Sequence, residues 1–398
     1  MYEWRREIDE IDERYLVDTL TSLLKIPTAV PLGPKTLMDP DDPILVHYVQ
    51  QVIRPELLRI RAYEIIDAPL NQLIVRLGNR KSDRSLLVMA YTPTQHSNLM
   101  ADPFSGKIGI PLDGQFDEPC AFGQGASQNK AHMAAMLAVI KLLIDRRIKL
   151  SGTLFFAVNN EGRSSHACTE ALLPLLFPKP QAGIIAIGTN MRISIGNRGR
   201  IDIYVHLKGK ATHSSDPEAG LSAIEGAYQV IKRLEALKLS KTHPILGGQR
   251  AIVYQIVYDP IAPHTLPATA KLTVDRRLIP GEDPGEAVEE VRAVLMNMAP
   301  YEVRVERGVC MLPSLTPADS PIVLALKEAS HEVRGKESET YYGRGTFDAG
   351  GLTSAGIPAV MFGASGMSND ILGEDYVCVR EVVGEPKMLA YTILKMLG

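Results

Sequence analysis

Hydrophobic residues recur at helical spacing in several stretches of the chain. From Asp9 to Leu24 they fall three or four positions apart, and Pro27 ends the pattern. A second helix is expected from Pro43 to about Leu58. The stretch Asn129–Arg146 is apolar almost all round, which predicts a buried helix.

Short apolar runs between these helices are typical of buried strands. They are Asn71–Leu77, Ser85–Ala90, Gly152–Val158 and Gly183–Ile187, with a further helix expected over Ser164–Leu176. Alternating strands and helices predict an α/β fold with a doubly wound, mainly parallel sheet covered on both faces.

After Gly199 the pattern changes to one of strands with a polar face, beginning with Ile201–Leu207. Then come a helix (Leu221–Leu237), two strands (Ala251–Val257 and Ala270–Leu278), a helix (Asp283–Met298) and a strand (Tyr301–Val305). This β-α-β-β-α-β order is that of a ferredoxin-like α+β module. The earlier pattern of helices and strands resumes at Asp319–Arg334, Ala359–Gly363 and Gly384–Leu397. The module is therefore expected as an insert at 200–309 in a domain formed by 1–199 and 310–398.

Composition narrows the class of protein. A chain of 398 residues exceeds the roughly 250–300 at which one core usually stops growing, so two domains are expected. A net charge of -3 indicates neither a nucleic-acid nor an anionic-membrane surface. The four cysteines form no CxxC pair, and we interpret them as reduced thiols. The charged N-terminus and the lack of a long apolar run predict a cytoplasmic protein with a small-molecule partner.

Three blocks of sequence combine an apolar run or Gly-rich turn with polar residues. They are Leu86–Pro93, Phe122–Lys130 and Phe155–Gly162. Ligands of open α/β sheets bind outside the carboxyl ends of the strands. The three blocks therefore predict one pocket.

Several motifs in order give the chain a family resemblance. They are Asp102-Pro103-Phe104-Ser105, Gly123-x-Gly125-Ala126, Gly199, Gly209–Ser215 with Pro217 and Gly220, Pro267 with Asp275-Arg276-Arg277, and Asp348-Ala349 with Gly356-Ile357-Pro358. Through them nearly the whole chain resembles the co-catalytic zinc amidohydrolases, which include acetylornithine deacetylase, succinyl-diaminopimelate desuccinylase and glutamate carboxypeptidase. The resemblance implies a homodimer that pairs through the inserted domain.

The same resemblance implies a site of two zinc ions bridged by an aspartate, with a glutamate as general base. Carried over residue by residue, the first metal histidine falls on Tyr91, its supporting aspartate on Pro93, the bridging aspartate on Gln128, the catalytic glutamate on Asn160 and the next metal glutamate on Glu161; the last two ligands fall near Ile187 and Ile371. Amide, phenol and alkyl groups cannot hold two Zn²⁺ ions, and an amide is no general base near neutral pH. No metal or other cofactor is therefore expected.

The substrate-facing residues differ less from the family pattern. The resemblance implies that His213 reaches a partner's active site and stabilises an oxyanion, that Arg277 contacts a substrate carboxylate and that Gly363 lines the leaving-group pocket; His264 stands where an asparagine is expected. The alternatives are a loop histidine at His213 and a salt bridge from Arg277 to Asp275 or Glu282. Tyr91, Gln128 and Asn160 form either a hydrogen-bonded plug or a new polar pocket.

Metal ligands could also have moved to other positions. His96, Asp102, Asp117, His132 and His166 lie near the pocket in sequence, but no HxD or HxxxH pair is present there. We expect His132 and His166 to be solvated or capping residues. A nucleophile role for Ser165, His166 and Cys168 lacks an identifiable orienting acid.

The sequence thus predicts a divergent amidohydrolase that binds a small amide-, acyl- or amino-acid-like ligand without the dinuclear zinc centre. Any turnover would be metal-independent hydrolysis of an amide or peptide C–N bond. The expected catalytic residues are Glu161 and His213, and the expected binding residues are Tyr91, Gln128, Asn160, Arg277, His264 and Gly363. The alternatives are a non-catalytic binding or regulatory subunit, alone as a homodimer or with an intact paralogue, and a metal-dependent hydrolase with relocated ligands.

Overall fold

The computed structural model describes residues 4–30, 38–94, 99–160, 165–343, 345–368 and 374–398. The chain forms two compact units. Unit 1 comprises Met1–Gly196, Ser314–Gly343 and Phe347–Gly398, and unit 2 comprises Asn197–Pro313 with Arg344–Thr346. These bounds differ by a few residues from the division into 1–199 with 310–398 and 200–309 that the pattern predicts.

Unit 1 is built on a large sheet with the strand order β1-β2-β6-β3-β7-β19-β8-β17, in which β18 also pairs with β8. The strands are β1 (Ile65–Ala68), β2 (Gln72–Gly78), β3 (Ser85–Tyr91), β6 (Thr153–Asn159), β7 (Ala182–Ala186), β8 (Ile193–Asn197), β17 (Ser314–Leu315), β18 (Thr340–Gly343) and β19 (Ala359–Phe362). The central strands β6, β3, β7 and β19 are parallel, whereas β1, β2 and β8 pair antiparallel. The predicted mainly parallel sheet is confirmed.

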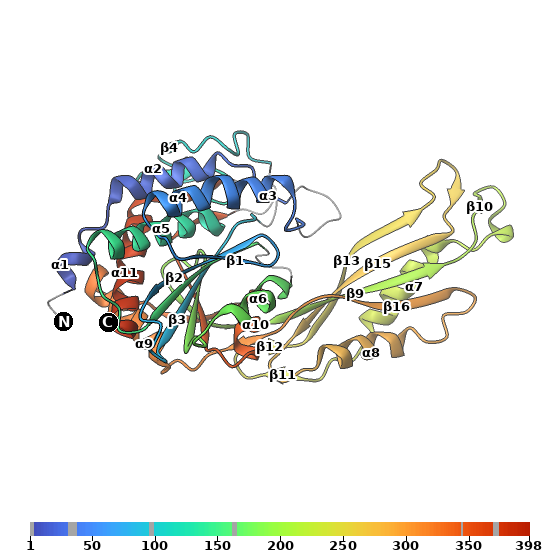
Figure 1. Ribbon diagram of the computed structural model, residues 1–398. Helices are drawn as coiled ribbons and strands as arrows, with labels where there is room; N and C mark the ends of the chain where they lie inside the picture. The colour runs from blue at the N-terminus through green and yellow to red at the C-terminus, as the bar shows by residue number, and fades with distance from the viewer. Residues whose placement is uncertain (1–3, 31–37, 95–98, 161–164, 344, 369–373) are drawn as a thin grey trace. The chain divides into compact units, whose positions relative to one another are not determined.

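Helices cover both faces of this sheet (Figure 1). One face carries α2 (Glu13–Leu24), α5 (Ala131–Asp145), α9 (Pro321–Arg334) and α11 (Val379–Leu397), and the other carries α6 (Ala167–Leu172) with its η3 turn (Leu173–Leu175) and α10 (Ala349–Ser354). Alternate residues of β3 pack on opposite faces: Val88 joins the α5 core, and Met89 joins the core of Leu172 and Leu352. This two-sided burial explains the unbroken apolar run of β3.

The N-terminal part adds four short helical segments: α1 (Arg5–Ile8), α3 (Pro43–His47), the π-helix η1 (Tyr48–Ile53) and α4 (Arg54–Arg59). The segments over 43–59 follow one another directly and match the helix expected from Pro43 to about Leu58. In the described part of the chain, no helix is long and apolar enough to cross a membrane.

A second, four-stranded sheet in unit 1 was not predicted. Its order is β20-β21-β5-β4, with β4 (Ile108–Gly109), β5 (Cys120–Phe122), β20 (Gly366–Ser368) and β21 (Asp375–Cys378). Ala121 and Val377 pack into the main core. Their strand neighbours point to the other face and form a separate small cluster there.

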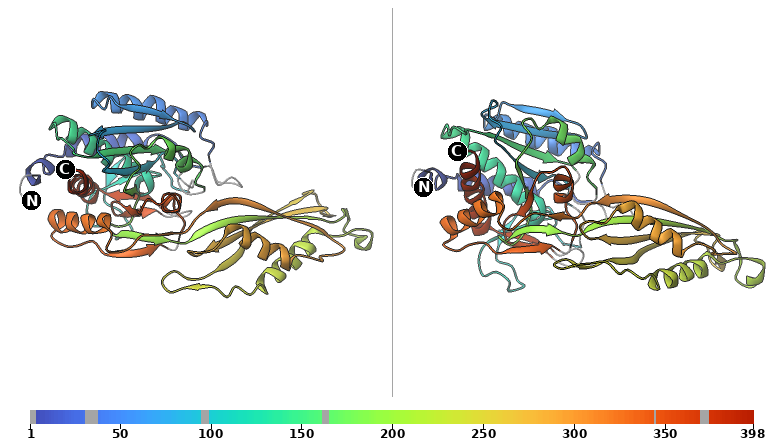
Figure 2. Two further views of the ribbon diagram at one scale, coloured as in Figure 1. Left: turned by 60° about the horizontal axis from the view of Figure 1, so that its bottom comes forward. Right: turned by 90° about the horizontal axis from the view of Figure 1, so that it is seen from below.

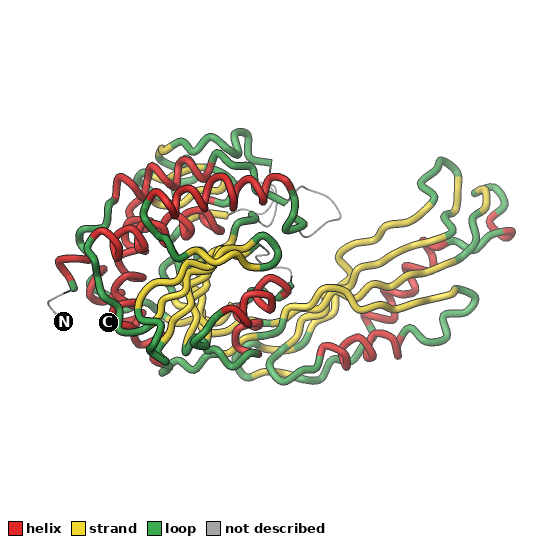
Figure 3. Tube along the Cα trace, in the orientation of Figure 1, coloured by secondary structure: helices red, strands yellow, loops and turns green. Residues whose placement is uncertain are grey.

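Unit 2 is a four-stranded antiparallel sheet covered on one face by α7 (Ala223–Glu235) and α8 (Pro284–Val294) (Figures 2 and 3). The strand order is β13 (Arg250–Asp259), β15 (Thr269–Leu278), β9 (Gly199–Lys208) and β16 (Glu302–Met311). In chain order these are the second, third, first and fourth strands, so the ferredoxin-like prediction is confirmed. Shorter elements complete the unit: β10 (Thr212–His213) paired with β14 (Thr265–Leu266), β11 (Thr242–His243) paired with β12 (Gly247–Gly248), and the turn η4 (Pro217–Ala219).

Candidate functional site

The carboxyl ends of β3 and β6 lie side by side at one edge of the large sheet. Tyr91 is the parallel register partner of Asn159, and the Thr92 amide donates to the Asn159 carbonyl at 2.9 Å. The side chain of Asn129, on the following turn, donates to the carbonyls of Tyr91 and Thr92 at 3.3 and 2.8 Å. These contacts bring the expected positions Tyr91, Gln128 and Asn160 to the same edge.

The Gly-rich turn before α5 continues into η2 (Ala126–Lys130) and is held by the buried carboxylate of Asp375. The backbone amides of Gly125 and Ser127 donate to it at 2.7 and 3.1 Å. Gly125 has a φ of 87°, and a Cβ there would lie 2.3 Å from the Thr94 hydroxyl, so glycine is required. Burial raises the pKa of Asp375 to about 6, although the amides stabilise its charged form.

Lys130 is the last residue of η2. It is fully buried, and its Nζ donates to the Ile26 carbonyl at 2.6 Å. Burial lowers the pKa of Lys130 to about 7, partly opposed by the charge of Asp375. Its ammonium group therefore titrates near neutral pH.

Asn160, the residue at the position of the family's catalytic glutamate, is fully buried. Its amide nitrogen donates to the carbonyls of Asn71 and Leu70 at 2.9 and 3.2 Å, and its oxygen accepts from the Thr92 hydroxyl. The amide nitrogen thus holds the loop before β2, and the oxygen holds Thr92, which follows β3. At Asn160 these hydrogen bonds favour the plug alternative, and its substrate-binding role stays a prediction.

The side chains at the expected metal positions do not fit a dinuclear zinc centre. Tyr91 and Gln128 are buried and carry no charge, and Ile187 packs among apolar residues. In the described ranges, no three His, Cys, Asp or Glu side chains gather where they could hold a metal ion. Neutral amide, phenol and alkyl groups offer neither the charge nor the donors that two Zn²⁺ ions need. Glu161, Ile371 and His96 lie outside the described residues.

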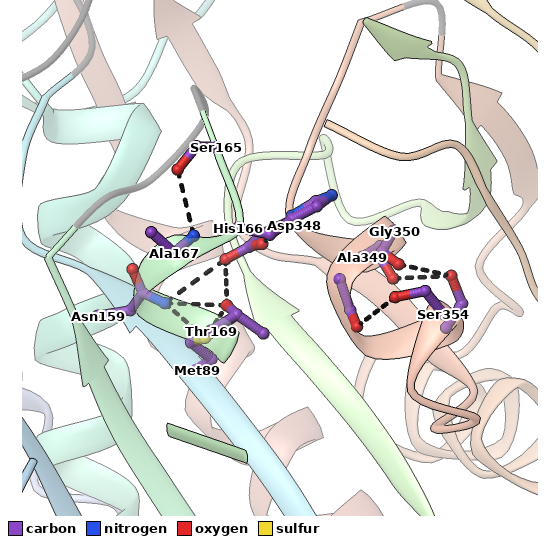
Figure 4. Close-up of polar contacts among 12 residues, drawn as sticks. Met89, Asn159, Ser165, His166, Ala167, Thr169, Asp348, Ala349, Gly350 and Ser354 are labelled. Carbon is purple, nitrogen blue, oxygen red and sulfur yellow. Dashed lines mark hydrogen bonds and ion pairs between the residues drawn. The ribbon is translucent and has the colours of Figure 1, made fainter. Parts of the chain in front are cut away.

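A polar cluster beside this edge supplies the orienting acid that the sequence did not reveal (Figure 4). The Nδ1 of His166 lies 2.5 Å from Oδ1 of the fully buried Asp348. The other carboxylate oxygen accepts from the Thr169 hydroxyl and, at 3.5 Å, from the Asn159 amide. His166 precedes α6, but its ring makes no cap hydrogen bond there. The expectation of a solvated or capping histidine is therefore wrong for His166.

The same expectation is wrong for His132, which is fully buried in α5. Its Nδ1 lies 2.9 Å from both carboxylate oxygens of Glu385 in α11, and its Nε2 lies 3.0 Å from the Ser127 carbonyl. Glu385 also accepts from the Ala364 amide at 2.9 Å. Because a Cβ on Gly363 would lie 2.5 Å from the His132 ring, Gly363 is required for this packing.

The structure brings together the expected histidines of unit 2. His213 in β10 and His264 before β14 are both exposed, with ring centroids 6.1 Å apart. The Ser214 amide donates to the His264 carbonyl at 2.7 Å, and His213 Nδ1 lies 2.7 Å from the Ser215 hydroxyl. Arg277 is elsewhere in the unit and pairs with Asp275 at 2.7 Å, the salt bridge considered from the sequence.

Asp348 and Glu385 are the residues that sequence reasoning missed. In the sequence Asp348 is recognisable only as part of a motif, and its partner His166 is 182 positions away. Glu385 is 253 positions from His132. No local pattern connects residues so far apart, so only the folded chain could reveal the pairs.

Comparison with known proteins identifies the unit 2 module. The profile of the peptidase dimerisation domain of the M20 group matches residues 195–302. Acetylornithine deacetylase of Myxococcus xanthus is 28% identical over 287 residues, covering 69% of this chain and 68% of that protein. Succinyl-diaminopimelate desuccinylase of Aliarcobacter butzleri is 21% identical over 292 residues, covering 71% and 75%.

Solved structures share the fold of the whole chain. An M20 family metallo-carboxypeptidase from Sulfolobus solfataricus superposes with a TM-score of 0.77 at 17% identity, covering 97% of this chain and 99% of its own. A dipeptidase from Saccharomyces cerevisiae has a TM-score of 0.76 at 13% identity, covering 98% and 97%. Residues 195–302 of this chain thus match the M20 peptidase dimerisation domain, and the chain as a whole shares the fold of M20 peptidases.

Proposed function

We propose that this protein is a divergent M20 amidohydrolase homologue that binds a small amide- or N-acyl-amino-acid-like ligand without a dinuclear zinc centre. The observation that carries the proposal is the chemistry at the family's metal positions. Tyr91, Gln128 and Asn160 are buried neutral side chains, and the amide of Asn160 is engaged by backbone carbonyls and Thr92. Neutral side chains at these three positions lack the charge that holds zinc in the family.

The ligand class follows from relatives and from the residues expected to face the substrate. The curated relatives are named as a deacetylase and a desuccinylase, which act on N-acyl groups. His213 and His264 offer exposed imidazoles, and Arg277 retains a guanidinium partly exposed beside Asp275. Imidazole and guanidinium groups suit an acyl oxygen and a carboxylate.

We further propose that the protein is a homodimer that pairs through unit 2. Strand β13 lies at the edge of its sheet, and large apolar side chains are exposed on it and on α7. They are Ile252, Tyr254, Ile256, Val257 and Tyr258 on β13, with Ile224 and Tyr228 on α7. A long apolar edge strand needs a partner in water. The cytoplasm stays the proposed location.

The test is ligand binding with and without chelation. A panel of N-acetyl and N-succinyl amino acids and dipeptides is titrated by calorimetry into protein dialysed against a chelator and into untreated protein. We expect the same ligand to bind both preparations with the same affinity. Binding that disappears on chelation, or no binding by any member of the panel, contradicts the proposal.

A non-catalytic binding subunit is the second candidate function. It is favoured by Asn160, since an amide cannot act as the general base that the family uses there. Release of free amine from the bound ligand distinguishes the two. Turnover that survives chelation and is lost in His166→Gln supports an enzyme using the His166–Asp348 pair, whereas binding without amine release supports the subunit.

A further inference from the structure

Two cysteines far apart in sequence lie opposite one another in the small sheet of unit 1. Strand β21 pairs antiparallel with β5, and the register places Cys378 directly across from Cys120. The Cys378 amide donates away from β5, to the Ser365 carbonyl at 3.0 Å, whereas the next amide, of Val379, donates to Pro119 at 3.0 Å. Cys120 and Cys378 therefore form a non-hydrogen-bonded pair. At such pairs the Cα atoms lie about 4.5 Å apart, within the roughly 4.4–6.8 Å that a disulfide spans.

Both thiols point to the face of the sheet that is turned away from the main core. They form a small cluster with Phe122 and Tyr376, against which Met100 and Phe116 pack. Cys120 Sγ donates to the Glu118 carbonyl at 3.5 Å. The thiols are thus buried beneath segment 99–119, which contains Met100 and Phe116, and not within the main core.

Tyr376 lies beside the thiols and contacts segment 99–119, which covers them. The Tyr376 hydroxyl donates to Asp113 at 2.6 Å, and the Phe116 ring meets the Tyr376 ring edge-on at 6.0 Å between centroids. Most of segment 99–119 has irregular backbone structure, and Leu112 in it is 98% exposed. Segments of this kind open locally at much lower free energy than the core.

We propose that Cys120 and Cys378 form a dithiol site that a low-molecular-weight disulfide oxidises to an intramolecular disulfide. One protein thiolate attacks the small disulfide and releases one small thiol; the second protein thiolate then displaces the other small thiol and closes the Cys120–Cys378 bond. The protein loses two electrons and two protons, and the small disulfide gains both as two thiols. Burial raises the pKa of Cys120 to about 12 and that of Cys378 to about 11, so reaction proceeds from the locally opened form.

The bond would join two strands next to the candidate site. β21 also carries Asp375, which holds the amides of Gly125 and Ser127, and β5 leads directly into that turn. A cross-link between residues so distant in sequence restricts the unfolded chain, which raises the unfolding temperature. The oxidised protein should therefore unfold at a higher temperature than the reduced protein.

The experiment oxidises the reduced, folded protein with oxidised glutathione, blocks the remaining thiols and maps disulfides by mass spectrometry of non-reduced peptides. We expect a peptide that links Cys120 to Cys378 in the wild type and in Cys310→Ser, whose half-buried cysteine lies in unit 2. Cys378→Ser and Cys120→Ser should give no intramolecular link. Tyr376→Phe, which removes the hydrogen bond to Asp113, should speed linkage severalfold.

The denatured chain, oxidised in parallel, verifies the oxidant, and circular dichroism verifies the fold of each variant. Wild-type protein whose four thiols all stay free under conditions that oxidise the denatured chain overturns the proposal. Linkage of any other pair also overturns it. An unfolding temperature that rises on oxidation in the wild type but not in Cys378→Ser supports it independently.

Discussion

The fold buries the polar residues at the sheet edge of unit 1. It leaves those at the β10–β14 tip of unit 2 exposed. At the edge, Asn160, His132 and Glu385 are fully buried, and each has partners from distant segments. At the tip, His213 and His264 are exposed. A buried polar group is tolerated only when hydrogen-bonded, whereas an exposed one has water as an alternative partner.

The difference separates polar residues that the fold needs from polar residues that it leaves exposed to solvent. The edge side chains are part of the core of unit 1, so changing them should chiefly affect the free energy of unfolding. The tip side chains should contribute little to stability and are free to serve a ligand or a second subunit. Four variants test this contrast.

Glu385→Ala should have the largest effect. It leaves the buried His132 ring and the Ala364 amide without their carboxylate partner, and each buried polar group left unsatisfied costs about 1–3 kcal/mol. Urea unfolding measures the loss. Glu381→Ala is the control one turn earlier in α11, where a partly exposed pair with Arg334 should be worth about 1 kcal/mol or less. Equal losses in both variants would contradict the structural role of Glu385.

Lys130→Met should change how stability depends on pH. The pKa of Lys130 is lowered from 10.5 to about 7 in the folded protein, so between these values the unfolded chain binds more protons. The contribution of Lys130 to stability therefore rises with pH across this window, by about 2 kcal/mol from pH 7 to pH 9 at 1.36 kcal/mol per unit.

Unfolding curves of wild type and Lys130→Met at several pH values from 7 to 9 measure this contribution. The loss of the hydrogen bond to Ile26 lowers the variant's stability by a constant amount and leaves the slope unaffected. The wild type should gain stability relative to the variant as the pH rises. Parallel profiles would show that Lys130 is not desolvated.

Asn160→Asp should destabilise unit 1 by about 1–3 kcal/mol, since the new oxygen faces the carbonyls of Leu70 and Asn71 without a proton to donate. Chemical denaturation at pH 7 provides the value. Asn79→Asp is the matched control: it is exposed, and its oxygen accepts from the Lys81 amide, so the change should be small. An Asn160→Asp variant with an unchanged free energy of unfolding would contradict the structural role of this side chain.

His213→Ala should have the smallest effect on stability, within about 0.5 kcal/mol, because the side chain is exposed. The proposed function expects the same variant to weaken ligand binding. Thermal unfolding and calorimetric titration are compared on one preparation. A large loss of stability would mean that His213 supports the fold as the edge residues do. It would contradict the difference drawn between the edge of unit 1 and the tip of unit 2.

The sequence was informative where periodicity extends over a whole element. It predicted β3, β6, α5 and the six elements of unit 2, because each buries a continuous face. It missed the small sheet, since β4, β5, β20 and β21 have two to four residues each and the central pairing of β5 with β21 spans more than 250 positions. The pairs His132–Glu385 and His166–Asp348 were hidden for the same reason.

The family resemblance located the edge but not the contacts within it. That Asn160 would hold two backbone carbonyls depends on the loop before β2, which nothing in the residues around 160 encodes. Two sets of roles stay predictions: the catalytic roles of Glu161 and His213, and the substrate-facing roles of Tyr91, Gln128, Asn160, Arg277, His264 and Gly363.

Metal content tests the central claim most directly. Protein purified without an affinity tag or added metal is analysed by inductively coupled plasma mass spectrometry, alongside ligand binding by the same sample. The account predicts a folded protein with far less than one equivalent of zinc, manganese or cobalt that still binds its ligand. Near-stoichiometric metal, with ligand binding lost when the metal is removed, would contradict it.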